Sequence, residues 1–542
     1  MFVSRRSDWG FTAKVLALAL TLALVGCGDD DDDDDDDEDC KGGSAGNPVT
    51  LSGKVTYDFI PATYSTNTRT GTLGFAQSAE RPVRSAVVQV RQGTNTLTTG
   101  TTDEQGNYQL SFTPGACGAL TLVALAKSTN PEIQVEDNTD GDAIWALGDS
   151  ITATTTTKNL HATHGWTGTT YSANARTAAP FAILDSMYTA SKAFMAVRTV
   201  TFPALKVNWS PNNVPQNGDK KSGAISTSHF SFTENEIYIL GKSGVDTDEY
   251  DSHVIVHEWG HYFEANLARA DSPGGPHSTG DVLDPRLAFG EGYGNALAAM
   301  LLPESIYVDT LWTNSTSGPP LAFGFDAETA PSPTDDPSPS VFSESSVMRA
   351  LYDLYDSGSN ESYDGVALGL GPVYDVLVGP QKSTDALTTI GSFIAGLKAQ
   401  PGVSASAVDT LMAHYGVGAV TSPFGDGDSK LRAMYTVVPN AYPYSTTTTL
   451  RGKAEYNKQQ QNRYFVFSGT GRTMNISAAN TLEDVGIEIY KRGELVGSAD
   501  ESFQGTESVS IPSTSGTQYV LVVTGYSARD ANYDVSVSIT SP

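Results

Sequence analysis

The sequence predicts a multidomain α+β protein with an N-terminal β-sandwich, a central, mostly helical domain that contains a small β-sheet, and a C-terminal β-sandwich. Three observations predict this class. Apolar and polar residues alternate with period two between residues 48 and 128 and again between 446 and 542, as in half-buried strands. Between these regions, apolar residues recur at helical spacing. The length of 542 residues suits about three or four domains.

The chain is strongly acidic, with a formal net charge of −29. This charge excludes nucleic acid as a partner, because phosphate groups require clustered Lys and Arg. It also argues against electrostatic docking on anionic lipid. Hydrophobic residues make up 39% of the chain, which is enough for globular cores. None of the three cysteines has the paired spacing of a zinc ribbon or a redox motif.

Residues 1–26 have the features of an export signal. Basic residues near the start precede an apolar run at 15–25, which is too short for a comfortable transmembrane helix. The run ends in Leu24-Val25-Gly26-Cys27, which resembles a bacterial lipobox. That resemblance implies cleavage before Cys27 and attachment of a lipid to its thiol, so that the lipid is the only membrane contact and the protein is exported to the cell envelope. An ordinary signal peptide is the alternative.

Residues 27–47 are predicted to form a tether between the lipid and the first domain. They contain an unbroken acidic run at 29–39, which repels itself and stays extended. Cys40 at the end of this tether is able to pair with Cys117 in the first β region, or both can remain free thiols.

Residues 48–165 are predicted to form the N-terminal β-sandwich and a connector. The segment 100–110, a strand followed by a Gly-containing turn and a second strand, resembles the carboxypeptidase regulatory-like β-sandwich. This resemblance implies a spacer or interaction role. In the connector, Asp137, Asp140 and Asp142 surround a glycine, as in a structural Ca²⁺ loop. A solvated turn is favoured, because the spacing does not match a full EF-hand.

The region 166–440 is predicted to be the central domain. Helices are expected at 178–197, 252–270, 285–302, 344–356, 384–399 and 404–414. Strands are expected at 205–207, 224–227 and 236–240. The segment 316–340 is rich in Pro, Ser and Asp and is therefore expected to be an exposed loop.

A pentapeptide in the second of these helices, His257-Glu258-Trp259-Gly260-His261, is an HExxH motif. Residues four apart lie on the same face of a helix, so both imidazoles can reach one ion. Zinc accepts imidazole and carboxylate ligands, and a catalytic zinc keeps one position open for water. Glu258 is then placed to accept a proton from that water. The spacing therefore predicts a zinc site with His257 and His261 as ligands and Glu258 as the general base.

The third ligand is expected from the helix at 285–302. Asp284 followed by Pro285 is a typical helix start, with a capping acid before Pro at the first helical position. The segment Gly290-Glu291-Gly292-Tyr293-Gly294 then places three glycines around Glu291. Because each glycine disfavours a helix by about 1 kcal/mol, we interpret them as sites of close helix approach. This approach would bring Glu291 to the metal.

These two helices resemble those of the gluzincins, the thermolysin-like zinc peptidases, and most closely the fungalysin type. The motif match covers about fifty residues, and a weaker similarity in organisation covers 170–435. The resemblance implies that His257, His261 and Glu291 bind zinc and that Glu258 is the general base. Asn295 stands where these families carry an Asp that orients a zinc-binding His. Its carbonyl oxygen can accept the same imidazole N–H, but without a charge.

A second departure from the family concerns the histidine that stabilises the oxyanion, which is missing from the segment 341–352. Candidates for this role are Tyr352, Tyr355, His277 and His414. The strand at 235–240 is either the edge strand that pairs with peptide substrate in gluzincins or an ordinary sheet strand. His253, four residues before the motif, is interpreted as a capping or surface residue.

Residues 446–542 are predicted to form the C-terminal β-sandwich. The strands at 463–467, 487–490 and 519–523 resemble the bacterial pre-peptidase C-terminal domain, which is often attached to secreted proteases. That resemblance implies binding or maturation and no second active site.

The leading hypothesis is a zinc-dependent endopeptidase whose substrates are extracellular or envelope proteins or peptides. A non-catalytic surface binding or adhesion lipoprotein with a vestigial or structural metal is the alternative. It is motivated by the two β-sandwiches and the missing oxyanion histidine. A structural zinc normally has four protein ligands, and the sequence identifies three.

Overall fold

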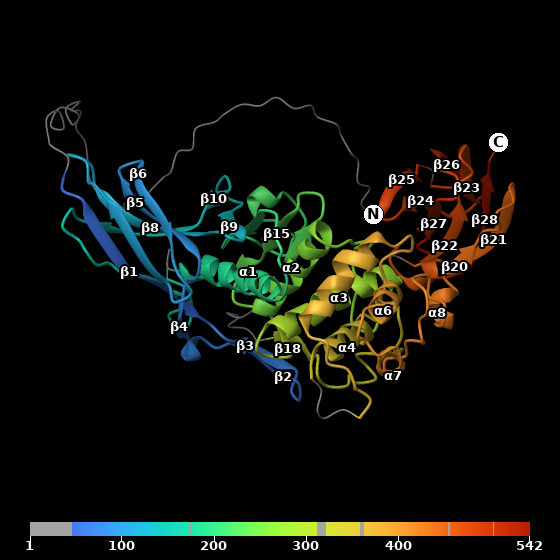
Figure 1. Cartoon of the computed structure of the whole chain (residues 1–542), viewed down its shortest axis with the longest axis horizontal. Helices are drawn as coiled ribbons and strands as arrows, with labels where there is room; N and C mark the ends of the chain where they lie inside the picture. The colour runs from blue at the N-terminus through green and yellow to red at the C-terminus, as the bar shows by residue number, and fades with distance from the viewer. Residues whose placement is uncertain are drawn as a thin grey trace.

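The computed structural model describes residues 46–172, 176–311, 321–357, 362–453, 456–501 and 503–541. The molecule is elongated, with strands at both ends and helices in the middle (Figure 1). This arrangement confirms the predicted multidomain α+β class. The predicted export signal, the lipid attachment at Cys27 and the acidic tether lie outside the described residues. Within the described ranges, no helix is long and apolar enough to cross a membrane.

The N-terminal region is built from strands, turns and a short 3-10 helix at Phe75–Gln77. Its strands are β1 (Val49–Phe59), β2 (Ala62–Ser65), β3 (Thr70–Leu73), β4 (Ala79–Pro82), β5 (Ala86–Gln92), β6 (Asn95–Thr101), β7 (Asn107–Phe112), β8 (Leu120–Thr129), β9 (Glu132–Asp137), β10 (Ala143–Ile144), β11 (Ala146–Ile151) and β12 (Leu160–Ala162). Strands β12, β1 and β4 form one sheet, and β7 pairs with β1. The hairpin β2–β3 leaves this region and packs on strands of the central region.

A nine-stranded mixed sheet combines strands from both sides of residue 165. Its order is β14-β15-β13-β9-β8-β5-β6, with β10 and β11 paired at its side. The central region supplies β13 (Leu205–Trp209), β14 (His229–Ser231) and β15 (Glu236–Ile239). Strand β13 pairs in parallel with β9 on one side and with β15 on the other. The N-terminal and central regions therefore share backbone hydrogen bonds as well as a core.

The edge of this sheet is β14, which pairs antiparallel with β15 in the register Phe230↔Ile237. The strand expected at 235–240 is thus an inner strand, and the suggestion that it is the edge strand is wrong. The strand expected at 224–227 is also wrong, because Ala224 and Ile225 form only isolated bridges. Their backbone is held in a tight loop by hydrogen bonds to the segment 214–219.

Of the eight central α-helices in the described residues, six overlap the predicted positions and two, at Leu370–Val376 and Ser429–Arg432, were not predicted. They are α1 (Ala178–Val197), α2 (Ser252–Asn266), α3 (Pro285–Leu301), α4 (Glu344–Tyr355), α5 (Leu370–Val376), α6 (Ile390–Lys398), α7 (Ala405–His414) and α8 (Ser429–Arg432). A second sheet has the order β16-β17-β18-β19, from β16 (Gly241–Lys242), β17 (Asp246–Thr247), β18 (Ile306–Leu311) and β19 (Leu321–Asp326). Strand β19 lies in the segment expected to be a loop, so that expectation is wrong there.

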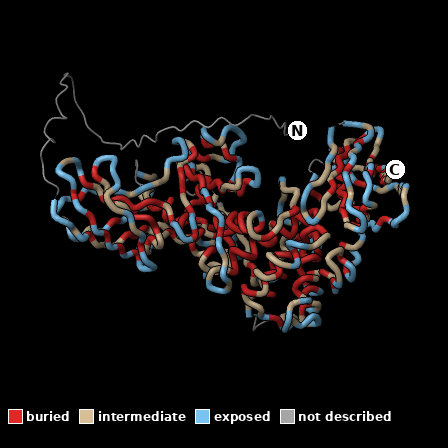
Figure 2. The backbone as a smooth tube through the Cα atoms, turned by 45° about the horizontal axis from the view of Figure 1, so that its top comes forward, coloured by how far each residue is buried: buried red, intermediate tan, exposed pale blue. Residues whose placement is uncertain are grey.

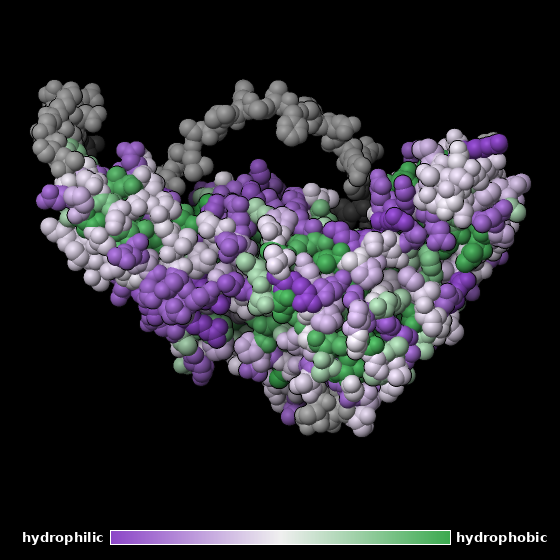
Figure 3. Space-filling model, viewed as in Figure 1, coloured by the Kyte–Doolittle hydropathy of each residue, from purple (hydrophilic) through white to green (hydrophobic). Residues whose placement is uncertain are grey.

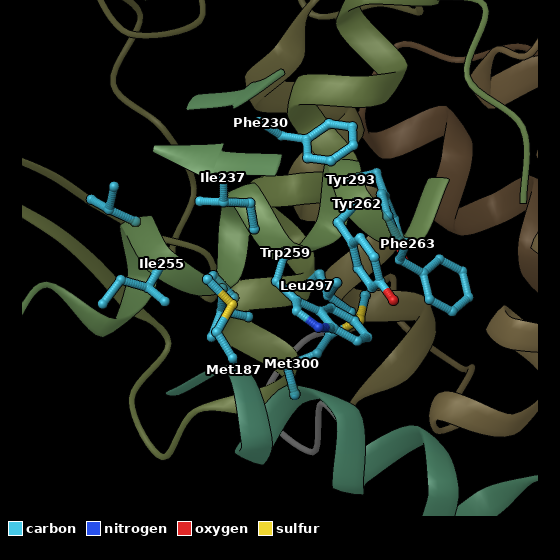
Figure 4. Close-up of a cluster of buried hydrophobic side chains, with 14 of the residues drawn as sticks. Met187, Phe230, Ile237, Ile255, Trp259, Tyr262, Phe263, Tyr293, Leu297 and Met300 are labelled. Atoms are coloured by element: carbon cyan, nitrogen blue, oxygen red, sulfur yellow. The ribbon is translucent and has the colours of Figure 1, made fainter. Parts of the chain in front are cut away.

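Helix α2 runs through the middle of the core, where buried residues are densest (Figure 2). Its Trp259 and Phe263 are fully buried and stack on Phe194 of α1. Figure 4 shows this cluster, with Tyr262 also from α2, Met187 from α1, Phe230 and Ile237 from the sheet, and Tyr293, Leu297 and Met300 from α3. Replacing such a buried aromatic by alanine costs about 3–5 kcal/mol. The packing therefore fixes α2 firmly against the sheet and α3.

The C-terminal region is a sandwich of two sheets with its own apolar core. The sheet orders are β20-β22-β27-β24-β25 and β21-β28-β23-β26. The strands are β20 (Tyr435–Val437), β21 (Tyr444–Arg451), β22 (Asn462–Ser468), β23 (Thr473–Asn480), β24 (Val485–Lys491), β25 (Glu494–Ala499), β26 (Gly505–Pro512), β27 (Gln518–Gly525) and β28 (Asn532–Thr540). On the face shown in Figure 3, hydrophilic and hydrophobic residues are interspersed over all regions.

This sandwich packs against the start of α3. Tyr464 on β22 is fully buried, and its hydroxyl donates a 2.7 Å hydrogen bond to Oδ2 of Asp284. Asp284 caps α3 by accepting from the Arg286 backbone N–H, and it also pairs with the Arg286 guanidinium. The predicted helix start at Asp284-Pro285 is confirmed. The C-terminal region therefore supports the helix that carries Glu291.

Two further expectations concern the N-terminal region. Cys117 is disulfide-bonded, and its predicted partner Cys40 lies outside the described residues. The segment 137–142 is the turn between β9 and β10, in which Asp137 accepts hydrogen bonds from the backbone and hydroxyl of Thr139. This agrees with a solvated turn and does not support the alternative of a calcium loop at this position.

Candidate metal centre

The HExxH motif lies on α2 as expected, with His257 and His261 on successive turns. Their Nε2 atoms are 3.1 Å apart. The Oε2 atom of Glu291 on α3 lies 3.3 Å from Nε2 of His257 and 3.5 Å from Nε2 of His261. All three side chains are largely buried, with exposed fractions of 10%, 11% and 16%. The structure therefore brings the three predicted ligands together.

The three separations are those expected for ligands of one zinc ion. Ligand atoms held 2.0–2.2 Å from a tetrahedral zinc lie about 3.3–3.6 Å apart. The measured distances of 3.1, 3.3 and 3.5 Å are close to these values. Two imidazoles and one carboxylate are also a donor set that zinc accepts in catalytic sites. The residues present fit a metal ion of this kind.

The glycines of α3 allow the close helix approach that the sequence predicted. A Cβ atom at Gly294 would lie 2.8 Å from Nδ1 of the His257 ring, and one at Gly292 would lie 2.7 Å from Cγ1 of Val347 on α4. Where α2 and α3 cross, a Cβ atom at Gly260 would lie 3.3 Å from the Cα atom of Gly294. Any side chain at position 294 would therefore push the helices or the imidazole apart.

Polar side chains behind the two histidines orient both rings. Nδ1 of His257 donates to Oδ1 of Asn295 over 2.8 Å, which is the contact predicted from the sequence. Nδ2 of Asn295 in turn donates to Oε1 of Glu344 at 2.7 Å. Nδ1 of His261 faces Oε2 of Glu264 at 3.3 Å. Both rings thus direct Nε2 toward Glu291, the orientation that a metal ligand needs.

The charges of the group reinforce one another. Burial opposes ionisation of Glu291, but the neighbouring His261 and His257 hold the pKa of its carboxyl well below its usual range. Burial also opposes protonation of His261, yet Glu291 and Glu264 raise the pKa of the imidazole well above its usual value. The negative charge of Glu291 and Glu264 therefore lies close to the two rings. A metal cation bound by the rings would be stabilised by the same charge that favours protonation of His261.

Glu258, the predicted general base, lies on α2 between the two histidines. Its Oε2 atom accepts a 2.7 Å hydrogen bond from the backbone N–H of Phe230 on the edge strand β14. No partner for its other oxygen is found among the described residues. The carboxylate is therefore anchored by one oxygen to the sheet edge, and its charge acts on His261.

A cavity of about 500 Å³ opens beside the metal group. Asn295 and Glu344 line it on the side of the group, and Phe323 of β19 and Met348 of α4 line the rest. Tyr64 and Arg69, from the hairpin β2–β3 and its turn, complete the wall. The N-terminal region therefore contributes directly to the surroundings of the site.

Of the four candidates for oxyanion stabilisation, His277 lies at the group. Its Nε2 atom is 3.7 Å from Oε2 of Glu291 and 3.5 Å from Oε2 of Glu344. Tyr352 and Tyr355 contact each other on α4, and His414 stacks on Tyr363. These contacts do not bring the latter three to the metal group.

His253 is buried, so it is not the surface residue that was predicted, and it is not among the residues of the metal group. Its Nε2 atom donates to the backbone carbonyl of Glu304 at 3.0 Å, and burial lowers its pKa. His253 therefore links α2 to the chain before β18.

Three groups that hydrogen-bond to residues of the metal centre were not identified from the sequence. Glu264, three residues after His261, has a spacing that could have revealed it. Glu344 and the backbone of Phe230 carry no local signal, because they reach the site only through the tertiary fold.

No family model and no curated protein matches this chain. Solved structures match about one fifth of it. The pre-peptidase C-terminal domain of a collagenase from Bacillus anthracis is 11% identical, with a TM-score of 0.16, and the match covers 20% of this chain and 92% of that one. CorA, a surface-associated copper-binding protein important for copper acquisition in Methylomicrobium album BG8, is 11% identical with a TM-score of 0.16, covering 20% and 98%. PliG of Aeromonas hydrophila, a periplasmic inhibitor of g-type lysozyme, is 15% identical with a TM-score of 0.15, covering 20% and 96%.

Proposed function

We propose that this protein is a zinc-dependent endopeptidase that hydrolyses peptide bonds of extracellular or envelope proteins. The observation that carries the proposal is the convergence of His257, His261 and Glu291 at the separations of a tetrahedral zinc site, with Glu258 on the same helix. Three protein ligands leave one position for water, as catalytic zinc sites do. When bound, zinc supplies Lewis acidity, which lowers the pKa of water and polarises a carbonyl group.

The residues of the chain then have distinct tasks. Glu258 accepts the proton of the attacking water and passes it to the leaving amine. The hydrogen bond from the Phe230 N–H holds the Glu258 carboxylate in place while its other oxygen accepts the proton. His277, at the rim of the group, donates to the oxyanion that develops on the substrate carbonyl.

The edge strand β14 supports an extended peptide as the substrate. Among the described residues no strand pairs with its outer side, so a peptide can add there through backbone groups other than the Phe230 N–H, which Glu258 already binds. Phe232, just beyond this strand, is 52% exposed and its ring lies 6.2 Å from that of His261. A substrate bound along β14 would therefore pass Phe232 on its way to the metal group.

The location belongs to the same proposal. Export directed by residues 1–26 and lipid attachment at Cys27 would place the enzyme at the cell envelope, where the tether at 27–47 holds it away from the membrane. The region 166–440 acts as the peptidase domain, and the sandwiches at 48–165 and 446–542 support it.

The experiment compares the purified protein with a Glu258→Gln variant on fluorescence-quenched casein. We expect cleavage by the wild type, loss with a zinc chelator, recovery when zinc is added back, and a decrease of about 100-fold or more in the variant. The variant should still bind one zinc per chain, because Glu258 is not a ligand.

Two histidine substitutions distinguish the loss of the metal site from a general loss of folded structure. His257→Gln should lose zinc and activity, whereas His414→Gln, whose ring stacks on Tyr363, should retain both. Equal cleavage by the wild type and Glu258→Gln would refute the mechanism. A protein that lacks stoichiometric zinc would favour the alternative of a non-catalytic surface protein.

A further inference from the structure

A second group of ligand-type side chains lies at the base of α2, apart from the first. Asp246, Asp248 and Asp309 each direct a carboxylate oxygen to one place, with the three oxygens within 4.8 Å of one another. Asp246 belongs to β17 and Asp309 to β18, neighbouring strands that meet in the register Asp246↔Leu311. Asp248 lies in the short loop that leads into α2. Two segments, 246–248 and β18, therefore converge here.

A fourth carboxylate lies beside this group. Asp251 precedes α2 and is completely buried, but it does not cap the helix with its side chain. Instead, its Oδ2 atom accepts from the backbone N–H and hydroxyl of Thr310, at 2.7 and 2.9 Å, which holds it next to Asp309. Its Oδ1 atom is buried and has no hydrogen-bond partner. Its charge acts on the carboxylates of Asp309 and Asp246.

The four carboxylates have no counter-charge among the residues that the structure describes. Among the described residues, no Lys, Arg or His forms an ion pair with any of them. One oxygen of each is buried without a hydrogen-bond partner, and Asp248 is 3% exposed while its other oxygen accepts from the hydroxyl of Ser228. Burial raises the pKa of all four side chains, and repulsion by the neighbouring carboxylates adds to this shift for Asp246, Asp248 and Asp251. Buried carboxylates normally have cationic partners or bind metals.

We propose that Asp246, Asp248, Asp251 and Asp309 form a binding site for one Ca²⁺ ion. Carboxylate oxygens are the ligands that calcium prefers, and oxygens bound at 2.3–2.6 Å to one calcium lie at most about 5 Å apart. The oxygens of Asp246, Asp248 and Asp309 meet this limit, and the bonds to Thr310 hold Asp251 next to Asp309. A cation is also the partner that the four unpaired oxygens lack. The site contains no imidazole or thiolate, so it does not favour zinc.

The calcium site lies where a bound ion would stabilise the segments that position His257. The ion would join the loop before α2 to β18 and so fix where the motif helix begins. Tyr307, two residues before Asp309 on β18, packs its ring 6.2 Å from the ring of His257. Calcium would therefore order the surroundings of His257 without touching it. The inference does not depend on peptidase activity.

The test uses zinc-loaded full-length protein dialysed into calcium-free buffer, followed by titration with CaCl₂ or MgCl₂. We expect one calcium per chain by calorimetry and a rise in Tm of about 5 °C with CaCl₂. The Asp309→Asn variant should bind calcium at least tenfold more weakly. Without calcium it should be more stable than the wild type, because one of four repelling charges is gone.

Asp140→Asn provides the matched control, because Asp140 is an exposed acid in the turn 137–142 that the sequence offered as another calcium loop. This variant should bind calcium as the wild type does. If Asp309→Asn is unstable, Asp246→Asn removes a ligand from the other strand and should show the same loss. The proposal is overturned if the wild type shows no calcium-dependent shift, if MgCl₂ acts equally well, or if Asp140→Asn alone abolishes binding.

Discussion

The hydrogen-bonded series Glu344–Asn295–His257 allows a test of how a negative charge affects a zinc ligand. In the zinc peptidases that the motifs resemble, an Asp contacts the histidine directly. Here the carboxylate belongs to Glu344 and is separated from the histidine by Asn295. An amide at position 295 connects the His257 ring to a carboxylate, through hydrogen bonds of 2.8 and 2.7 Å. We predict that the Glu344 charge strengthens His257 as a zinc ligand through this amide. The test is a double-mutant cycle of Glu344→Gln and Asn295→Asp.

The expected magnitudes follow from the geometry. A glutamine in place of Glu344 can still accept from the Asn295 amide, so Glu344→Gln removes the charge and retains the hydrogen bond. Hydrogen bonds to charged groups exceed neutral ones by about 1–1.5 kcal/mol, which corresponds to zinc binding weakened about 5–10-fold. Asn295→Asp alone sets two carboxylates side by side, and their repulsion of up to about 4 kcal/mol offsets any gain. The double variant restores one charge, and its zinc affinity should return to the wild-type value.

Zinc dissociation constants measured by competition with a chelating dye give the result, and kcat/KM provides a second readout. Glu494→Gln, an exposed acid on β25, serves as the control and should change neither quantity. The reasoning fails if Asn295→Asp changes zinc affinity by the same factor in the wild-type background and in the Glu344→Gln background, since the two positions would then be uncoupled.

Three further predictions address other parts of the molecule. Gly294→Ala should weaken zinc binding at least tenfold in dye competition, because its Cβ would lie 2.8 Å from the His257 ring. We expect this effect even though alanine favours helices over glycine by about 1 kcal/mol. Unchanged zinc affinity would contradict the close approach of the helices at this position. Tyr464→Phe should destabilise the protein by about 2 kcal/mol in urea unfolding, because Asp284 loses a buried donor; an effect near zero would show that the C-terminal region does not support α3. Burial raises the pKa of Asp309 to about 6, so in the calcium-free fold this group is stabilising at low pH and increasingly unfavourable as pH rises. Asp309→Asn should therefore raise Tm more at about pH 8 than at about pH 5, and an equal change at both would refute the assignment.

Local patterns were sufficient to predict the two helices of the metal centre. The spacing of His257 and His261 identifies one face of a helix, and Asp284-Pro285 marks where the next helix begins. The glycines around Glu291 predicted close contact, and the space at Gly294 is indeed filled by the His257 ring. Each of these features depends on residues within one or two helical turns, where periodicity and capping rules apply.

The strands and contacts that could not be predicted depend on residues far apart in the sequence. Strand β14 has three residues, too few for a period, and it is the edge only because β15 pairs with β13 on its other side. Strand β19 lies in a segment rich in turn residues and is stabilised by β18 and the hairpin β2–β3. Glu344 meets Asn295 because α3 and α4 pack closely at Gly292, and no nearby residue of the sequence signals this contact.

The adjacency of β9 and β13 bears on what proteolysis between the N-terminal and central regions would do. A cut near residue 165 would leave the two fragments joined by the backbone hydrogen bonds of a shared sheet. Loss of the N-terminal fragment would strip β13 of a neighbour and uncover the side of α1 that packs on β1, β8 and β9. Loss of the N-terminal fragment after such a cut is therefore disfavoured, and a nicked molecule is expected to persist as a non-covalent complex.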